Sequence, residues 1–368
     1  MNLVYILMRE ITFVESIRET TEQILNENPN VIVIGEGVPD PKSIFGSTKG
    51  LQEKFGKDRV FDMPVSENGM TGICIGAAIQ GIRPILIHQR IDFMLYAMDQ
   101  MINNAAKWNS MFGGQAGNVP MVVRAIIGRG WGPGNQHSQN LAHLFSMFPG
   151  LKVVCPSNAR EAKEMLLWSV KEKGPVVFVE HRHLHGTTAH VEESMTAPEE
   201  IKAMVVREGR NLTLVAWSHM VNEALKAADK VEKFTGISVE VVDMRSLRPL
   251  DINTVKKSLK KTGRLLLLEE AWAQQSLSAE IISQIVEDKQ VHLYERPARM
   301  TLPNCYAPST HHLTKYYYPK TSDIAAKIVD MTFLFKTKLN CKLLIEGLIA
   351  DEAKVRHDVP DPSFKGPF

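Results

Sequence analysis

The sequence has few of the features that mark secreted, membrane or nucleic-acid-binding proteins. Only 4 of its 368 residues are cysteine, and Cys74, Cys155, Cys305 and Cys341 form no CxxC pair. Scattered cysteines are typical of reduced, buried thiols in a reducing compartment. No stretch approaches the ~20 consecutive apolar residues that a membrane-spanning helix needs. The formal net charge of +2 gives no basic excess. We therefore expect a cytoplasmic protein with neither nucleic acid nor a membrane as its partner.

Common catalytic and nucleotide-binding motifs are also absent. The chain contains no GxxxxGK[ST] phosphate loop, no HExxH zinc motif and no GxSxG nucleophile elbow. The glycine-rich residues 128–134 follow a predicted strand, but they do not match GxGxxG because Pro133 stands where a glycine is needed. This segment is therefore only weak support for a nucleotide site.

Short apolar runs alternate with helix-like segments along the first half of the chain. Hydrophobic residues make up 44% of the sequence, which is enough apolar material for two cores. The apolar runs are typical of strands that are buried on both faces of a parallel sheet. We predict strands at residues 31–34, 84–88, 121–127, 151–155 and 176–180, and helices at residues 12–26, 69–81, 93–112 and 159–171. Repeated βα units of this length predict a doubly wound α/β domain.

A second series of the same kind follows a linker-like segment at residues 186–200, which is rich in Gly, Thr, Ser, Pro and acidic residues. Its predicted strands lie at residues 212–217, 238–243 and 264–268, and its predicted helices at residues 222–230, 252–260, 277–286 and 321–334. The prediction is an α/β protein with two doubly wound domains, residues 1–190 and 205–334. Residues 335–368 are predicted to be a C-terminal extension or docking arm, because Pro360 and Pro362 disfavour a helix near the end.

A few polar and aromatic residues follow the predicted strands of the first domain. Glu36 follows the first strand, Glu67 precedes the helix at residues 69–81, Phe93 follows the strand at 84–88, and His137 follows the glycine-rich residues. Ligands of open α/β sheets bind beyond the carboxyl ends of the strands, so these residues could serve acid–base chemistry on a ring. Taken singly, each has a plainer explanation, such as an acid at a helix N-terminus or an aromatic residue in the core.

In these segments the sequence resembles the β subunit of the thiamine-diphosphate-dependent first component of pyruvate, branched-chain and acetoin dehydrogenase complexes. The resemblance extends over about residues 10–334. It depends on ordered motifs: VIGE at 33–36, DMPVSENG at 62–69, DQMINNAAK at 99–107, QHSQ at 136–139, PGLKVV at 149–154 and RSLRPLD at 245–251. It implies a transketolase-like pyrimidine-binding domain followed by a transketolase C-terminal-type domain. The implied reaction is oxidative decarboxylation of a 2-oxo acid, pyruvate foremost, with acyl transfer to a lipoyl group.

The resemblance implies a role for each residue that matches a family position. Glu67 matches the glutamate that hydrogen-bonds a pyrimidine nitrogen of thiamine diphosphate and so activates this cofactor. Glu36 matches an acid near the same ring, and Phe93 matches the residue that stacks on its face. His137 matches a histidine that faces the substrate carbon, where an imidazole can pass a proton. Glu67 and His137 are thus implied as catalytic residues, and Glu36, Glu67 and Phe93 as cofactor-binding residues.

One motif that the family needs is missing from the chain. Thiamine enzymes hold the diphosphate through a bivalent metal bound by a GDG motif, and no GDG occurs here. In the two-chain branch of the family, the α subunit carries that motif together with Mg²⁺. The resemblance therefore implies that this chain binds only the pyrimidine half of the cofactor. It also implies an α subunit and a second β subunit as partners, in an α2β2 assembly that serves a lipoyl acyltransferase core.

The resemblance also implies a loop that binds a monovalent cation. Ser169, Val170, Glu172 and Gly174 match the loop in which the family binds K⁺ largely through backbone carbonyl oxygens. Glu172 and Gly174 stand where Asp and Asn are common, so the match is incomplete.

Other departures from the family pattern leave alternatives open. Residues 88–90 (HQR) replace the usual acidic and aromatic residues, and they mark either an unusual substrate or a divergent wall of the site. His181, His183 and His185 alternate as metal ligands could, but a structural role is favoured. Residues 304–318, with paired histidines and a tyrosine triplet, also differ from the common pattern.

Two other functional classes remain open at the level of sequence. One is a single-chain transketolase-like enzyme that acts on sugar phosphates, which the missing GDG motif disfavours. The other is a non-catalytic scaffold subunit that has kept the fold, which the retention of Glu67, Phe93 and His137 disfavours.

Overall fold

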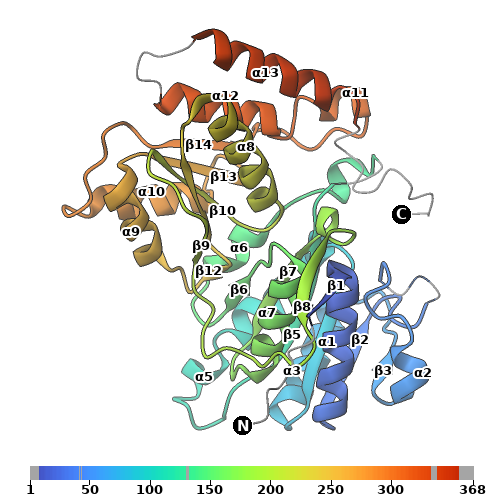
Figure 1. Cartoon of the computed structure of the whole chain (residues 1–368). Helices are drawn as coiled ribbons and strands as arrows, with labels where there is room; N and C mark the ends of the chain where they lie inside the picture. Colours follow the sequence, from blue (N-terminus) through green and yellow to red (C-terminus); the bar gives the residue numbers. More distant parts are fainter. Residues whose placement is uncertain (1–7, 41, 43, 130–131, 333–337, 356–368) are drawn as a thin grey trace, which may run out of the picture. The chain divides into compact units, whose positions relative to one another are not determined.

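The chain divides into two compact units. The computed structural model describes residues 8–355 except 41, 43, 130–131 and 333–337 (Figure 1). The first unit consists of Met1–Gly128, Leu141–Ile201 and Leu247–Pro249. The second consists of Arg129–Asn140, Lys202–Ser246 and Leu250–Phe368. The segment Arg129–Asn140 thus belongs to the second unit, although the first unit both precedes and follows it in the sequence.

The first unit is built on a seven-stranded sheet with the order β12-β6-β7-β5-β4-β2-β3. The pairs β2–β3, β2–β4, β4–β5, β5–β7 and β6–β7 are parallel. The strands are β2 (Val31–Gly35), β3 (Val60–Phe61), β4 (Arg83–His88), β5 (Val122–Ile127), β6 (Lys152–Val154), β7 (Val176–His181) and β12 (Ser246–Arg248). Strands of a parallel sheet are covered on both faces, which explains why β5 and β7 are buried along their whole length.

Helices α1 (Phe13–Glu27) and α7 (Ala159–Lys171) pack side by side against this sheet (Figure 1). Helix α1 begins at a capping box, in which Thr12 Oγ1 accepts from the Glu15 N–H at 3.2 Å and Glu15 Oε2 accepts from the Thr12 N–H at 2.9 Å. Helix α7 begins at Asn158, whose side chain accepts from the Glu161 N–H at 3.0 Å. Local sequence therefore fixes where both helices start.

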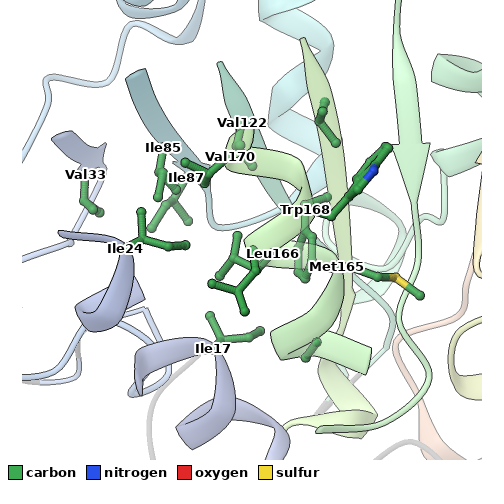
Figure 2. Close-up of a cluster of buried hydrophobic side chains, with 14 of the residues drawn as sticks. Ile17, Ile24, Val33, Ile85, Ile87, Val122, Met165, Leu166, Trp168 and Val170 are labelled. Carbon is green, nitrogen blue, oxygen red and sulfur yellow. The ribbon is translucent and has the colours of Figure 1, made fainter. Parts of the chain in front are cut away.

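The core of the first unit lies between these two helices and the sheet. Figure 2 shows side chains from both helices meeting side chains from β2, β4 and β5, among them Ile17, Ile24, Met165, Leu166, Val33, Ile85, Ile87 and Val122. Residues at i, i+3, i+4 and i+7 form one apolar face of each helix, and burial of that face stabilises the helix–sheet contact.

The remaining helical segments of the first unit are short, apart from α3 (Glu67–Ile79). The others are α2 (Leu51–Phe55), α4 (Ile91–Met94), a 3-10 turn (Leu95–Ala97), a π-helix (Asp99–Ala105), α5 (Trp108–Met111), α6 (Ala142–Ser146) and a 3-10 turn (Arg182–Leu184). The prediction of one long helix at residues 93–112 is therefore wrong. Side-chain pairs within the π-helix, from Asn103 to Asp99 and from Asn104 to Gln100, accompany the wider turn.

A two-stranded antiparallel pair was also missed from the sequence. Strand β1 (Met8–Thr12) pairs with β8 (Thr188–Glu192), and β8 lies within the segment that was predicted to be a linker. Its residues alternate between exposed and buried side chains, and its polar composition resembles that of a loop.

The second unit contains a five-stranded sheet with the order β14-β13-β10-β11-β9. Four of its strands run parallel, namely β10 (Leu212–Ala216), β11 (Val239–Asp243), β13 (Leu265–Trp272) and β14 (Ala298–Leu302). Strand β9 (Met204–Arg207) pairs antiparallel with β11. Helices α8 (His219–Thr235) and α12 (Thr321–Thr332) cover one face, and α9 (Ile252–Thr262) and α10 (Leu277–Glu287) cover the other (Figure 1). A 3-10 turn (Gly134–Gln136) and α11 (His311–Thr314) also belong to this unit. These two sheets confirm the predicted α/β class.

Part of the predicted C-terminal extension belongs to the second unit. Helix α13 (Lys338–Glu352) packs on α12 and α8, and Leu344 and Leu348 join the buried core there. Residues 335–337 and 356–368 lie outside the described residues, so a docking arm stays a prediction. Within the part of the chain that the structure describes, no helix is both long and apolar enough to cross a membrane.

The core of Figure 2 generates a test of the fold. Leu166 is fully buried between α7 and the sheet. We expect Leu166→Ala to lower the free energy of unfolding by ~2–5 kcal/mol, because it removes buried methyl groups and leaves a cavity. Urea unfolding followed by circular dichroism measures this change. Val286→Ala on α10, where the side chain is 62% exposed, is the control and should change stability by less than ~0.5 kcal/mol. Equal effects of the two substitutions would contradict this account of the core.

Candidate functional site

Three carboxyl groups gather at the carboxyl end of the first sheet. Glu36 follows β2, Asp62 follows the neighbouring β3, and Glu67 is the first residue of α3. Burial, the Glu67 carboxylate and the Asp62 carboxylate, in that order, raise the pKa of Glu36. Glu67 and Asp62 therefore each lie near enough to Glu36 to disfavour its charged form.

The three carboxyl groups differ in their hydrogen-bond partners. Asp62 Oδ1 accepts from the N–H groups of Gly37 and Met63, both at 2.9 Å. Glu67 is buried, and its place at the start of α3 gives it the favourable end of the helix dipole. Glu36 Oε1 is also buried, and it accepts no hydrogen bond from the described residues. Since buried oxygens are nearly always hydrogen-bonded, Glu36 lacks a donor that a ligand could supply.

Local structure fixes the position of Glu67 at the entry to α3. Ser66 precedes the helix, and the Thr71 hydroxyl donates to the Glu67 carbonyl oxygen at 2.6 Å. Gly69 lies so close to Ser66 that an added Cβ would stand 2.9 Å from the Ser66 hydroxyl oxygen. A side chain at position 69 would therefore require the Ser66 side chain, which precedes Glu67, to shift.

The aromatic candidate lies beyond the neighbouring strand. Phe93 is half-buried in α4, which follows β4, and β4 pairs with β2. The Gln89 side-chain amide donates to the Glu36 carbonyl oxygen at 2.8 Å and so links the end of β4 to the end of β2. The structure therefore brings Phe93 to the same sheet edge as Glu36 and Glu67.

His88 and Arg90 lie at the end of β4, near the same sheet edge. Burial lowers the pKa of His88 to about 4, so its imidazole is neutral at physiological pH. The Arg90 guanidinium donates to the Gly128 carbonyl oxygen at 2.9 Å and lies 5.9 Å from the Phe45 ring centroid. These contacts tie the ends of β4 and β5 together.

His137 lies in the second unit, in the segment Arg129–Asn140. It directly follows the 3-10 turn and is half-buried. Gly130 and Trp131 of the glycine-rich residues lie outside the described residues. The structure thus brings Glu36, Glu67 and Phe93 to one sheet edge of the first unit, whereas His137 belongs to the second unit.

The proposed monovalent-cation loop already has cationic partners. The Arg83 guanidinium donates to the carbonyl oxygens of Val170 at 2.6 Å and Glu172 at 3.1 Å. The Ser169 carbonyl oxygen accepts from the Glu172 N–H at 3.3 Å, and the Glu172 carboxylate pairs with Lys152. A K⁺ ion would have to share these oxygens with a guanidinium, so the loop fits Arg83 better than it fits a free cation.

The alternating histidines lie in and beside a buried ion-pair network. Glu180 pairs with Arg124 at 2.5 and 3.0 Å, and both side chains are fully buried. His185 Nε2 lies 3.6 Å from Glu180, and burial lowers the pKa of His185 to about 4. His181 Nδ1 accepts from the His183 N–H at 3.1 Å. Among residues 8–355 as described, no group of three or more His, Cys, Asp or Glu side chains has metal-site geometry.

Sequence reasoning assigned no role to Asp62, Arg83 or Arg124. Asp62 is the first residue of the DMPVSENG motif. Its position directly after a short strand could have indicated that its carboxyl group lies at the sheet edge. Arg83 and Arg124 act through partners 87 and 56 residues away in the sequence. No local pattern reports such contacts.

Comparisons with known proteins agree on both units. Residues 9–187 match the family described as transketolase, pyrimidine binding domain, and residues 201–324 match transketolase, C-terminal domain. The subunit beta-2 of the mitochondrial pyruvate dehydrogenase E1 component of Oryza sativa subsp. japonica is 39% identical over 323 residues, which are 86% of this chain and 85% of that protein. The beta subunit of acetoin:2,6-dichlorophenolindophenol oxidoreductase of Cupriavidus necator is 38% identical over 328 residues, 86% of this chain and 96% of that protein.

Two further similarities extend this comparison. The beta subunit of the pyruvate dehydrogenase E1 component of Bacillus subtilis is 36% identical over 303 residues, 82% of this chain and 92% of that protein. A solved structure titled split gene transketolase, inactive beta4 tetramer, matches with a TM-score of 0.72 and 21% identity, covering 88% of this chain and 98% of that chain. The structural likeness supports the fold, whereas the sequence identities indicate the closer relationship.

The raised pKa of Glu36 generates a pH-dependent prediction. A carboxyl group whose pKa is higher in the folded than in the unfolded chain binds its proton more tightly when folded. The wild type should therefore gain stability relative to Glu36→Gln as the pH falls through the raised pKa towards ~4.5. Urea unfolding at pH 4 to 8 measures this difference, and Glu53→Gln on the exposed side of α2 is the control. A difference between wild type and Glu36→Gln that stays constant over this range would contradict the assignment.

Proposed function

Because this chain belongs to the β-subunit family of thiamine-diphosphate-dependent 2-oxo acid and acetoin dehydrogenases, we propose that it supplies the pyrimidine-binding half of a thiamine diphosphate site. The proposed reaction is oxidative decarboxylation of a 2-oxo acid, with pyruvate as the first candidate and acetoin as the second, followed by acyl transfer to a lipoyl group. The observation that carries the proposal is the buried Glu36 oxygen without a donor, beside Glu67.

An aminopyrimidine ring has hydrogen-bonding groups and a flat face that complement the residues of this sheet edge. Its amino group can donate to a carboxyl oxygen such as Glu36 Oε1, and its ring nitrogens can pair with Glu67. Phe93 offers a half-buried ring for offset stacking, which contributes about 0.5–1.5 kcal/mol in comparable pairs. When bound, thiamine diphosphate would supply the electron sink for cleavage of the carbon–carbon bond.

Two residues of this chain, Glu67 and His137, would transfer protons. Glu67 would exchange a proton with the pyrimidine ring, since it is a buried carboxyl group at the sheet edge that also carries Glu36. His137 would hold or donate a proton near the substrate carbon, because one imidazole nitrogen can accept a proton and the other can donate one. The diphosphate and Mg²⁺ would be held by the GDG motif of an α subunit.

The surface of α3 supports a partner subunit. Beyond Glu67 this helix contains no charged residue, yet Ile73 is 61% exposed and the preceding Val65 is 82% exposed. Gly69, Gly72 and Gly76 follow one another at helical spacing, so a neighbouring backbone could approach closely. An exposed helix surface that is mostly apolar favours coverage by another subunit, either an α subunit or a second β subunit in an α2β2 assembly.

The remaining parts of the proposal concern location, acyl acceptor and ions. We propose the cytoplasm, the location that the scattered cysteines favour, and a lipoyl acyltransferase core as the acceptor of the product. We propose no K⁺ site at Ser169, Val170, Glu172 and Gly174, because Arg83 and Lys152 already pair with this loop. A single-chain sugar-phosphate enzyme is the second candidate, and turnover of a ketose phosphate by the chain alone would favour it. A scaffold subunit would assemble without binding thiamine diphosphate.

Glu67 is the residue that tests this proposal most sharply. In a complex with the α subunit, we expect Glu67→Gln to slow proton exchange at the thiazolium carbon. The expected rise in barrier is ~2.7–4 kcal/mol, the usual effect of removing one preorganised catalytic group. Nuclear magnetic resonance after rapid quenching in D₂O measures the exchange rate.

The control is the exposed Glu53→Gln, which changes the charge of the same unit by the same amount and should exchange at the wild-type rate. Calorimetry would verify that each variant still binds thiamine diphosphate. Wild-type exchange in a Glu67→Gln complex with bound cofactor would refute the role of Glu67.

A further inference from the structure

The segment that carries His137 begins with a buried arginine. Arg129 is 5% exposed, and its guanidinium carbon lies 3.8 Å from the ring centroid of Tyr318. Arg129 Nη1 lies 3.8 Å from Glu270 Oε2, and Glu270 and Tyr318 are each 3% exposed. All three residues belong to the second unit. A guanidinium that lacks water gains strongly from an aromatic face and a carboxylate, so this contact fixes the start of the segment.

The middle of the segment fits closely against Ser309. Gly132 and Gly134 have φ angles of +76° and +69°. A Cβ added to Gly132 would stand 2.7 Å from the Ser309 carbonyl oxygen, and one added to Gly134 would stand 2.3 Å from the Ser309 hydroxyl oxygen. Both the backbone conformation and the lack of space therefore require glycine here. The closeness of fit leaves little freedom to the backbone that leads to His137.

The residues after His137 also face the same part of the second unit. Ser138, Gln139 and Asn140 line a small cavity together with Trp272, Ala307 and Tyr317. Trp272 Nε1 and the Tyr317 hydroxyl both donate to the Cys305 carbonyl oxygen at 2.8 Å. These bonds hold residues 305–317 against the end of β13. His137 is thus flanked on both sides by contacts to one anchored segment.

We propose that Arg129, Glu270 and Tyr318, here called the Arg129 cluster, are positioning residues for His137. The cluster holds the start of the segment, and through it the imidazole, in the orientation that proton transfer needs. This inference rests on the proposed function, because it assigns the cluster a role only through His137.

Substitutions at Tyr318 separate positioning from general stability. In the complex with the α subunit, Tyr318→Leu removes the aromatic face, whereas Tyr318→Phe keeps it. The assay is reductive acylation of a lipoyl domain with pyruvate, acetoin or a branched-chain 2-oxo acid, whichever the wild-type complex turns over fastest. We expect Tyr318→Leu to lower kcat by ~10²-fold, the cost of misplacing a catalytic group by about 1 Å, with KM within about twofold of wild type. Tyr318→Phe should restore most of kcat.

A double-substitution cycle with His137→Ala provides the decisive comparison. If the cluster acts through His137, Tyr318→Leu should cause no further loss of kcat in the His137→Ala background. Proton exchange at the thiazolium carbon should keep the wild-type rate in Tyr318→Leu. Tyr316→Leu is the matched control, since Tyr316 is 74% exposed two residues away. Arg129→Lys, which keeps the charge but loses the planar group, provides a second route should Tyr318→Leu fail to assemble.

Each outcome of the cycle decides the question. Additive losses, or an equal loss of proton exchange, would overturn the inference, because they would assign Tyr318 to stability alone. A large effect of His137→Ala with none of Tyr318→Leu or Arg129→Lys would overturn the inference and leave the proposed function intact. No effect of His137→Ala would refute the role of His137 and the inference with it, whereas no turnover by the wild type would refute the proposed function itself.

Discussion

The placement of like charges at one sheet edge is the constraint on which the candidate site depends. Burial and the Glu67 and Asp62 carboxylates raise the pKa of Glu36. The three carboxyl groups also differ in the partners that the fold gives them. Asp62 accepts two backbone hydrogen bonds, Glu67 lies at a helix N-terminus, and Glu36 Oε1 has no donor among the described residues. Functional sites often contain a buried polar atom without a hydrogen-bond partner, and the amino group of an aminopyrimidine could donate to Glu36 Oε1.

The candidate residues are divided between the two units of the chain. The first unit provides Glu36, Glu67 and Phe93 at the ends of parallel strands, where the backbone of the sheet makes their positions rigid. His137 is in the second unit, although its segment lies between two strands of the first sheet in the sequence. The Arg129 cluster gives this segment the buried contacts that a glycine-rich stretch lacks by itself.

Much of the fold could be predicted because apolar periodicity and helix caps are local signals. Helix α7 at Ala159–Lys171 begins at Asn158 and ends where it was predicted. The π-helix at Asp99–Ala105 could not be predicted, since its pattern of apolar residues is that of an α-helix. The candidate site was found through ordered motifs, and the roles of its residues stay predictions. The contacts of Arg83, Arg124 and Arg129 were not predictable, because each joins residues far apart in the sequence.

The central claim is that this chain holds only half of a cofactor site. Isothermal titration of thiamine diphosphate with Mg²⁺ tests it most directly, with this chain alone, with a GDG-bearing α subunit alone, and with both together. The account predicts strong binding only for the mixture, with a stoichiometry that requires both chains, and decarboxylation of a 2-oxo acid only there. Tight binding or turnover by the isolated chain would contradict the account.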